Sequence, residues 1–212
     1  MGLTQLMGET LESARALFDQ GWLRAVLFSR DLESWIDLAP DPPRRVVNGR
    51  IYSETVSAAY NVWRWVAAEQ GLGPEEAPTA ELTTAAGVAV DISTWDQLLV
   101  TLTTFVRAQA VALRSVIAPG DEAARRAFGR PALDLAGHAA YGFAELRRRR
   151  FADPAAVQAQ YDRAVPATLH WLRDLDAAGG GDLAARWMAQ VQTLGGELGL
   201  TLPVTAGPLT DG

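Results

Sequence analysis

The spacing of apolar residues between positions 95 and 117 constrains this chain more than any other feature of its sequence. Six of them follow one another in steps of four and three residues, interrupted only by Gln109. Thr94 followed by Gln97 fits a capping box, which is typical of a helix start. The pattern is too broad and too short for a coiled-coil seam, so it predicts a core helix of a bundle. The six residues are Trp95, Leu99, Leu102, Val106, Leu113 and Val116.

The same periodicity recurs along most of the chain and is broken by proline and glycine. It predicts about seven main helices, and therefore an all-α, multi-helix bundle. The segment 79–90 is ambiguous, the segment 121–128 could be a short helix, and Pro166 should kink or split the helix that contains it. The expected main helices span residues 4–18, 22–38, 54–70, 95–117, 131–149, 154–178 and 183–194.

The stretch 45–52 departs from this pattern. Asn48-Gly49 stands between two short β-prone runs, which is the strongest short-range signal for a hairpin with a type I′ turn. We therefore expect one β-hairpin near residues 45–52. A lone hairpin is marginal in water, so its apolar side chains must pack on the chain's own helices or on a partner. This candidate interaction surface comprises Val46, Val47, Ile51 and Tyr52.

The chain has the length of one well-buried domain. We expect a single helical domain over residues 1–203, with a weak seam near 71–80 and an irregular tail over 204–212. The sequence contains no signal peptide and no apolar run long enough to span a membrane. A cytoplasmic location and no membrane partner are expected.

Composition excludes several chemistries. The 212 residues include no cysteine, and all 19 basic residues are arginine. Thiolate metal sites, cysteine nucleophiles and catalytic lysines are therefore excluded. Serine-nucleophile, dinucleotide-binding and P-loop motifs are absent. The net charge of −6 argues against nucleic acid as the default partner.

Two histidines, each one turn from an aspartate, form the sharpest chemical pattern. Asp134 precedes His138, and Asp174 follows His170. If the helices that carry them form an antiparallel hairpin, these four side chains could hold a divalent metal. A divalent metal is the only cofactor that the sequence suggests. The sequence does not decide whether the chain is an enzyme.

The helical wheel weakens that metal site. At 100° per residue, His138 points away from a face that contains Leu133 and Phe143, and His170 lies opposite a face that contains Val165. If those apolar faces are the buried ones, both histidines point outward into solvent.

A polar stripe follows the same helix in steps of four, three and four residues. It consists of Asp134, His138, Tyr141 and Glu145. Such a stripe can line a cleft with acid and base groups, but it is more typical of the solvated side of an amphipathic helix.

The order helix, turn, helix, hairpin over residues 4–52 suggests a winged-helix DNA-binding unit as another interpretation. Its hairpin would carry Arg44, Arg45 and Arg50. The acidic residues of the 22–38 helix, Asp31, Glu33 and Asp37, would repel phosphates.

Taken together, the sequence favours a soluble helical-bundle protein that acts by binding, most simply by self-association as a homodimer or with another protein. Seven tryptophans spread over most of the expected helices fit an aromatic pocket or an association surface, so a small-molecule ligand stays open. The alternatives are a metal-dependent or acid/base enzyme and a DNA-binding regulator.

Overall fold

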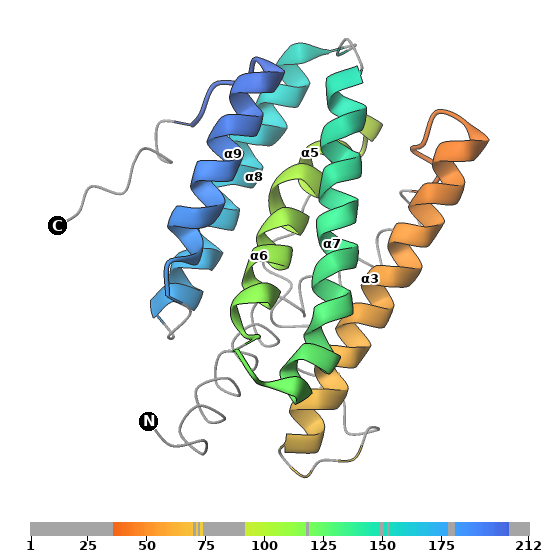
Figure 1. Ribbon diagram of the computed structural model, residues 1–212. Helices are drawn as coiled ribbons and strands as arrows, with labels where there is room; N and C mark the ends of the chain where they lie inside the picture. The colour runs from red at the N-terminus through yellow and green to blue at the C-terminus, as the bar shows by residue number, and fades with distance from the viewer. Residues whose placement is uncertain are drawn as a thin grey trace, which may run out of the picture.

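The computed structural model describes residues 36–69, 71, 73, 92–117, 119–148, 151, 153–177 and 181–203. This part of the chain is helical and contains no strand. It comprises five helices when three consecutive segments are counted as one rod (Figure 1). The segments are α3 (Pro42–Glu69), α5 (Trp95–Thr101), η2 (Leu102–Val106), α6 (Arg107–Ser115), α7 (Glu122–Arg148), α8 (Pro154–Leu175) and α9 (Leu183–Leu198).

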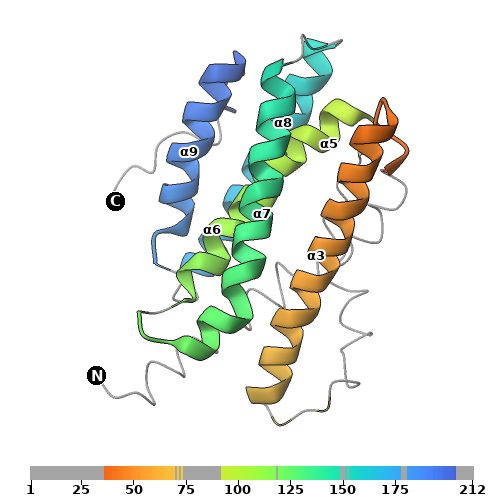
Figure 2. The same cartoon turned by 45° about the vertical axis from the view of Figure 1, so that its right-hand side comes forward.

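The rod formed by α5, η2 and α6 is the centre of the fold. Its first half packs against α7 and α8, and its second half packs against α7 and α9 (Figures 1 and 2). The capping box at its start is confirmed. The Thr94 hydroxyl accepts a hydrogen bond from the backbone N–H of Gln97, and the Gln97 side chain accepts one from the backbone N–H of Thr94. Burial on most sides explains why the apolar pattern of this segment is so broad.

The middle of the rod, η2, is a π-helical segment. The Thr104 carbonyl accepts a hydrogen bond of 3.0 Å from the indole of Trp187 on α9. Thr103 and Thr104 turn their hydroxyls back to the carbonyls of Leu99 and Val100, at 2.8 Å each. The two threonine hydroxyls and the Thr104 carbonyl of this buried segment are thus satisfied within the bundle.

The helix α7 combines two segments that the sequence separates. Pro131 lies inside α7, so the expected short helix 121–128 and helix 131–149 form one helix. Its contact with the rod is close at Gly142, where a Cβ atom would lie 2.8 Å from the Cβ of Leu102 and 3.0 Å from the carbonyl oxygen of Leu99. The face of α7 that contacts the rod is therefore not the one with Leu133, which is 63 % exposed.

The predicted hairpin near 45–52 is wrong, because these residues belong to α3. Gly49 does not adopt the positive φ that a type I′ turn needs. The cause lies in a buried face at helical spacing, formed by Asn48, Ile51, Thr55 and Ala58. Packing of this face outweighs the local turn preference of Asn-Gly.

The remaining differences concern helix ends and number. The expected seven helices are not found among the described residues. The expected helix 4–18, the ambiguous segment 79–90, most of the expected helix 22–38 and the tail 204–212 lie outside these residues. Pro166 lies within α8 without splitting it. The helix α9 runs to Leu198, four residues past the predicted end, and Gly199 ends it in the left-handed conformation with φ of 71°. No helix in the described ranges is both long and apolar enough to cross a lipid bilayer.

Candidate functional site

Charged side chains join α3 to α7 along a seam that we call the α3–α7 seam. It contains Arg44, Arg50 and Glu54 from α3 and His138 and Glu145 from α7, with Asp41 just before α3. The two helices run antiparallel at the edge of the described bundle (Figures 1 and 2). Of the described helices, α3 makes its main contacts with α7 alone, so the seam is the principal connection of α3 to the rest.

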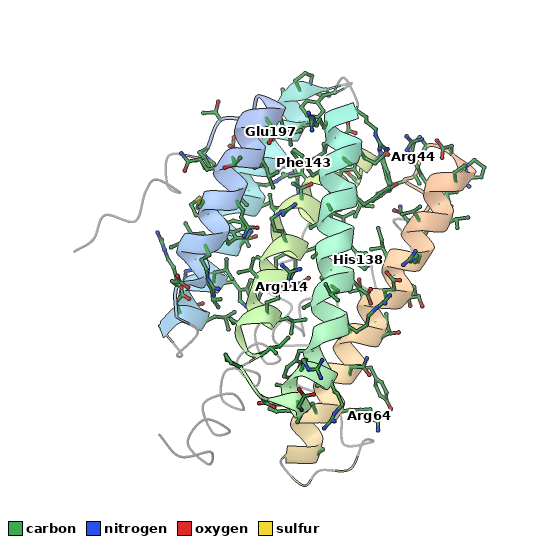
Figure 3. All side chains as sticks on the ribbon, in the orientation of Figure 1. Arg44, Arg64, Arg114, His138, Phe143 and Glu197 are labelled. Carbon is green, nitrogen blue, oxygen red and sulfur yellow. The ribbon has the colours of Figure 1, made fainter. Side chains whose placement is uncertain are left out.

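A histidine–glutamate pair occupies the middle of the seam. The Nε2 atom of His138 lies 2.7 Å from Oε2 of Glu54, whose Oε1 accepts from Nε of Arg50 at 2.7 Å. The side chain of His138 is 7 % exposed and that of Glu54 is 21 % exposed. Figure 3 shows His138 about half-way along α7, on the side of α3.

Burial governs the protonation of this pair. Burial lowers the pKa of His138 below 6.5, although hydrogen bonding to Glu54 acts in the opposite direction. Burial of Glu54 tends to raise its pKa, but hydrogen bonds from His138 and Arg50 outweigh burial and hold it below 4.5. At neutral pH we therefore infer a neutral imidazole that donates from Nε2 to a carboxylate.

Two buried polar groups, one in the pair itself and one next to Glu54 in the sequence, have no hydrogen-bond partner among the described residues. They are the Nδ1 atom of His138 and the hydroxyl of Thr55. The imidazole therefore keeps one free acceptor, and it is enclosed by the two helices instead of lining an open cleft.

A second charged cluster closes the end of the seam near the start of α3. Glu145 is buried and accepts from Nε of Arg44 at 2.7 Å and from Nη1 of Arg148 at 3.2 Å. Arg44 also binds Asp41. Hydrogen bonds to Glu145 and then to Asp41 raise the pKa of Arg44. The buried carboxylate of Glu145 is thus fully paired, as a buried charge must be.

Tyr141 lies between the two charged clusters in the sequence of α7. Burial, with the nearby charge of Glu145, raises the pKa of Tyr141 to about 12. Its hydroxyl has no hydrogen-bond partner among the described residues. A phenol with so high a pKa stays neutral and is a poor general base at physiological pH.

The seam becomes apolar toward the end of α3. The rings of Trp65 and Phe128 meet edge to face, with centroids 5.0 Å apart. Between Phe128 and His138 along α7, Nε of Arg130 contacts both carboxylate oxygens of Asp134, at 2.8 and 2.9 Å. Asp134 is therefore engaged by its own helix and does not bridge to α3.

The structure does not bring the four predicted metal ligands together. His138 is buried against Glu54, whereas His170 is 78 % exposed and lies 3.7 Å from Asp174. No group of three or more His, Cys, Asp or Glu side chains in the described ranges could hold a metal ion. The expectation that His170 points outward is confirmed. The same expectation for His138 is wrong, because the side of α7 that carries His138 is the buried one.

The predicted nucleic-acid residues lie on α3, and each of them forms an ion pair with a carboxylate. Arg44 pairs with Glu145 and Asp41, Arg50 pairs with Glu54, and Arg45 lies 3.7 Å from Asp37. The segment that would be the wing of a winged helix is a helix, and the preceding segments of that unit lie outside the described residues except at 36–38.

The residues of the predicted interaction surface separate on the two sides of α3. Ile51 is in the core, and Val47 and Tyr52 are partly buried against it. Val46 is exposed. Of these four residues, only Val46 is therefore exposed enough to contact a partner.

Comparison of this chain with protein-family models and with curated proteins finds no match.

Sequence reasoning found one side of the seam and missed the other. The polar stripe of Asp134, His138, Tyr141 and Glu145 is visible in the sequence. The partners of His138 and Glu145 on α3, Glu54 and Arg44, are 84 and 101 residues away from them. The one available signal was that the α3 segment also carries charges at helical spacing, which a hairpin interpretation conceals.

Proposed function

We propose that this protein acts by binding, as a helical protein that associates with a second copy of itself. The observation that carries this proposal is the location of the large apolar side chains that are exposed in the described part of the chain. Val46, Val56 and Tyr60 are on α3, and Leu133 is on the neighbouring α7. Single exposed apolar residues are ordinary, but three on one peripheral helix favour an association surface.

The chemistry of the α3–α7 seam supports binding over catalysis. Its acids, arginines and histidine engage one another, and His138 is enclosed between two helices. Catalytic acids and bases need a route to a substrate. We therefore assign the seam the task of holding α3 in place, with its other face available to a partner.

Sedimentation equilibrium over a dilution series tests this proposal. The wild-type chain should show a reversible monomer–dimer equilibrium, and Tyr60→Asp should shift it toward monomer because a charge would be buried in the interface. Ala189→Asp, at an exposed position of α9, is the matched control and should leave the equilibrium unchanged. A wild-type chain that remains monomeric at every concentration would refute self-association.

A further inference from the structure

The face of α3 that points away from α7 has the spacing of a helix-packing seam. Val46, Gly49, Ser53, Val56 and Tyr60 follow one another in steps of three, four, three and four residues. Val46 is 74 % exposed, Tyr60 is 52 % exposed and Val56 is 39 % exposed. At 100° per residue, these five positions lie roughly opposite the buried Asn48, Ile51, Thr55 and Ala58. We call them the outer face of α3.

We propose that a second copy of this chain packs its own α3 antiparallel on the outer face, with the two-fold axis beside Ser53. This inference rests on the proposed self-association and adds its site and geometry. In a two-fold contact the same patch must complement itself, so each residue before the axis meets one equally far behind it.

The outer face satisfies this condition at its two most exposed apolar side chains, Val46 and Tyr60. Val46 lies seven residues before Ser53 and Tyr60 lies seven residues after it, which is close to two helical turns in each direction. Antiparallel pairing therefore places Val46 of each copy against Tyr60 of the other. An apolar contact of this kind forms twice, once on each side of the axis.

The residues next to the axis permit the helices to approach closely. Gly49 and Ser57 stand four residues before and after Ser53, so the pairing places them opposite each other. A Cβ atom at Gly49 would meet none of the described residues within 4 Å, so the described helices leave the space above it open. Small side chains at the crossing let the flanking Val46 and Tyr60 reach their counterparts.

Charges at the two ends of α3 are complementary in this arrangement. Arg64 stacks on Tyr60, with its guanidinium carbon 5.9 Å from the ring centroid, and has no carboxylate partner among the described residues. It lies eleven residues after Ser53, and eleven residues before Ser53 the helix begins at Pro42. Asp37 stands near that end, 83 % exposed and 3.7 Å from Arg45. Antiparallel pairing brings Arg64 of one copy toward Asp37 of the other.

Cysteine cross-linking tests the position of the axis, because the natural chain contains no cysteine. A residue beside a two-fold axis meets its own copy, and Ser53→Cys should therefore form a covalent dimer under mild oxidation. The control is Leu133→Cys, at an exposed apolar position outside the outer face, which should remain largely uncross-linked. Sedimentation of the reduced variants shows whether each retains the wild-type equilibrium.

The outcomes separate this inference from the proposed function. If the wild-type chain is a dimer but Ser53→Cys does not cross-link while Leu133→Cys does, the α3 pairing is overturned and self-association is left intact. A monomer overturns both. If the chain is a monomer and the thiol of Ser53→Cys is protected from a thiol reagent, another part of the same chain covers the outer face.

A charge exchange tests the register independently. Arg64→Glu should weaken the dimer by about twofold to fivefold, as expected for an exposed interfacial ion pair. Adding Asp37→Arg to the same chain should restore the wild-type dissociation constant, because both changes meet across the axis. The pairing register is wrong if the double variant dimerises no better than Arg64→Glu alone.

Discussion

Replacing Gly49 by alanine should stabilise the protein, and this substitution tests the conformation of the segment that looks most like a hairpin. Gly49 lies inside a 28-residue helix, and its φ is not positive. An added Cβ would meet no other described residue within 4 Å. Since glycine inside a helix is about 1 kcal/mol less favourable than alanine, the gain should be about 0.5–1 kcal/mol. In a domain of this size, that raises the melting temperature by roughly 1–4 °C.

Urea and thermal unfolding measure this gain, and two protein concentrations separate it from any effect on association. The matched control is Gly199→Ala, where the left-handed φ of 71° makes the same change unfavourable by about 1 kcal/mol. The two variants should therefore shift the free energy of unfolding in opposite directions. If Gly49→Ala also destabilises the chain, Gly49 needs a positive φ, and the helical assignment of residues 45–52 fails.

Three further predictions concern the seam and the core. Acidification should destabilise the protein in two steps, because the folded state lowers the pKa values of both His138 and Glu54. Stability should fall first below about pH 6.5, where His138 binds a proton more readily in the unfolded chain than in the folded one. It should fall again below about pH 4.5, where Glu54 binds a proton more readily in the unfolded chain. In His138→Gln the first step should vanish from the pH profile of unfolding, and its persistence would mean that another group titrates there. Glu145→Gln should lower the free energy of unfolding in urea by about 2 kcal/mol. This is less than the roughly 3–5 kcal/mol typical of a fully buried ion pair, because the Arg44 side chain is 34 % exposed. An unchanged urea midpoint would show that Arg44 finds another partner. Gly142→Ala should destabilise by about 1–3 kcal/mol, since the new methyl would lie 2.8 Å from the Cβ of Leu102, and a neutral result would mean that α7 can move away from the rod.

The central rod could be predicted from the sequence because its signals are local and agree with one another. The capping box at Thr94 and Gln97 and the apolar steps that follow both indicate a helix, and the surroundings enforce it. The hairpin near Gly49 failed for the opposite reason. There the local turn preference conflicts with the helical spacing of Asn48, Ile51 and Thr55, and the packing of that face decides the conformation.

The candidate site could not be predicted from any local sequence pattern. The helical wheel of α7 offers two plausible buried faces, one with Leu133 and one with His138, and apolarity alone favours the wrong one. The choice is settled by α3, whose Glu54 and Arg44 compensate His138 and Glu145 and so allow a polar face to be buried. Because α7 buries the face with His138, the opposite face with Leu133 is exposed to solvent. A polar stripe on a helix is therefore evidence for solvent only when no other helix in the chain carries the complementary charges.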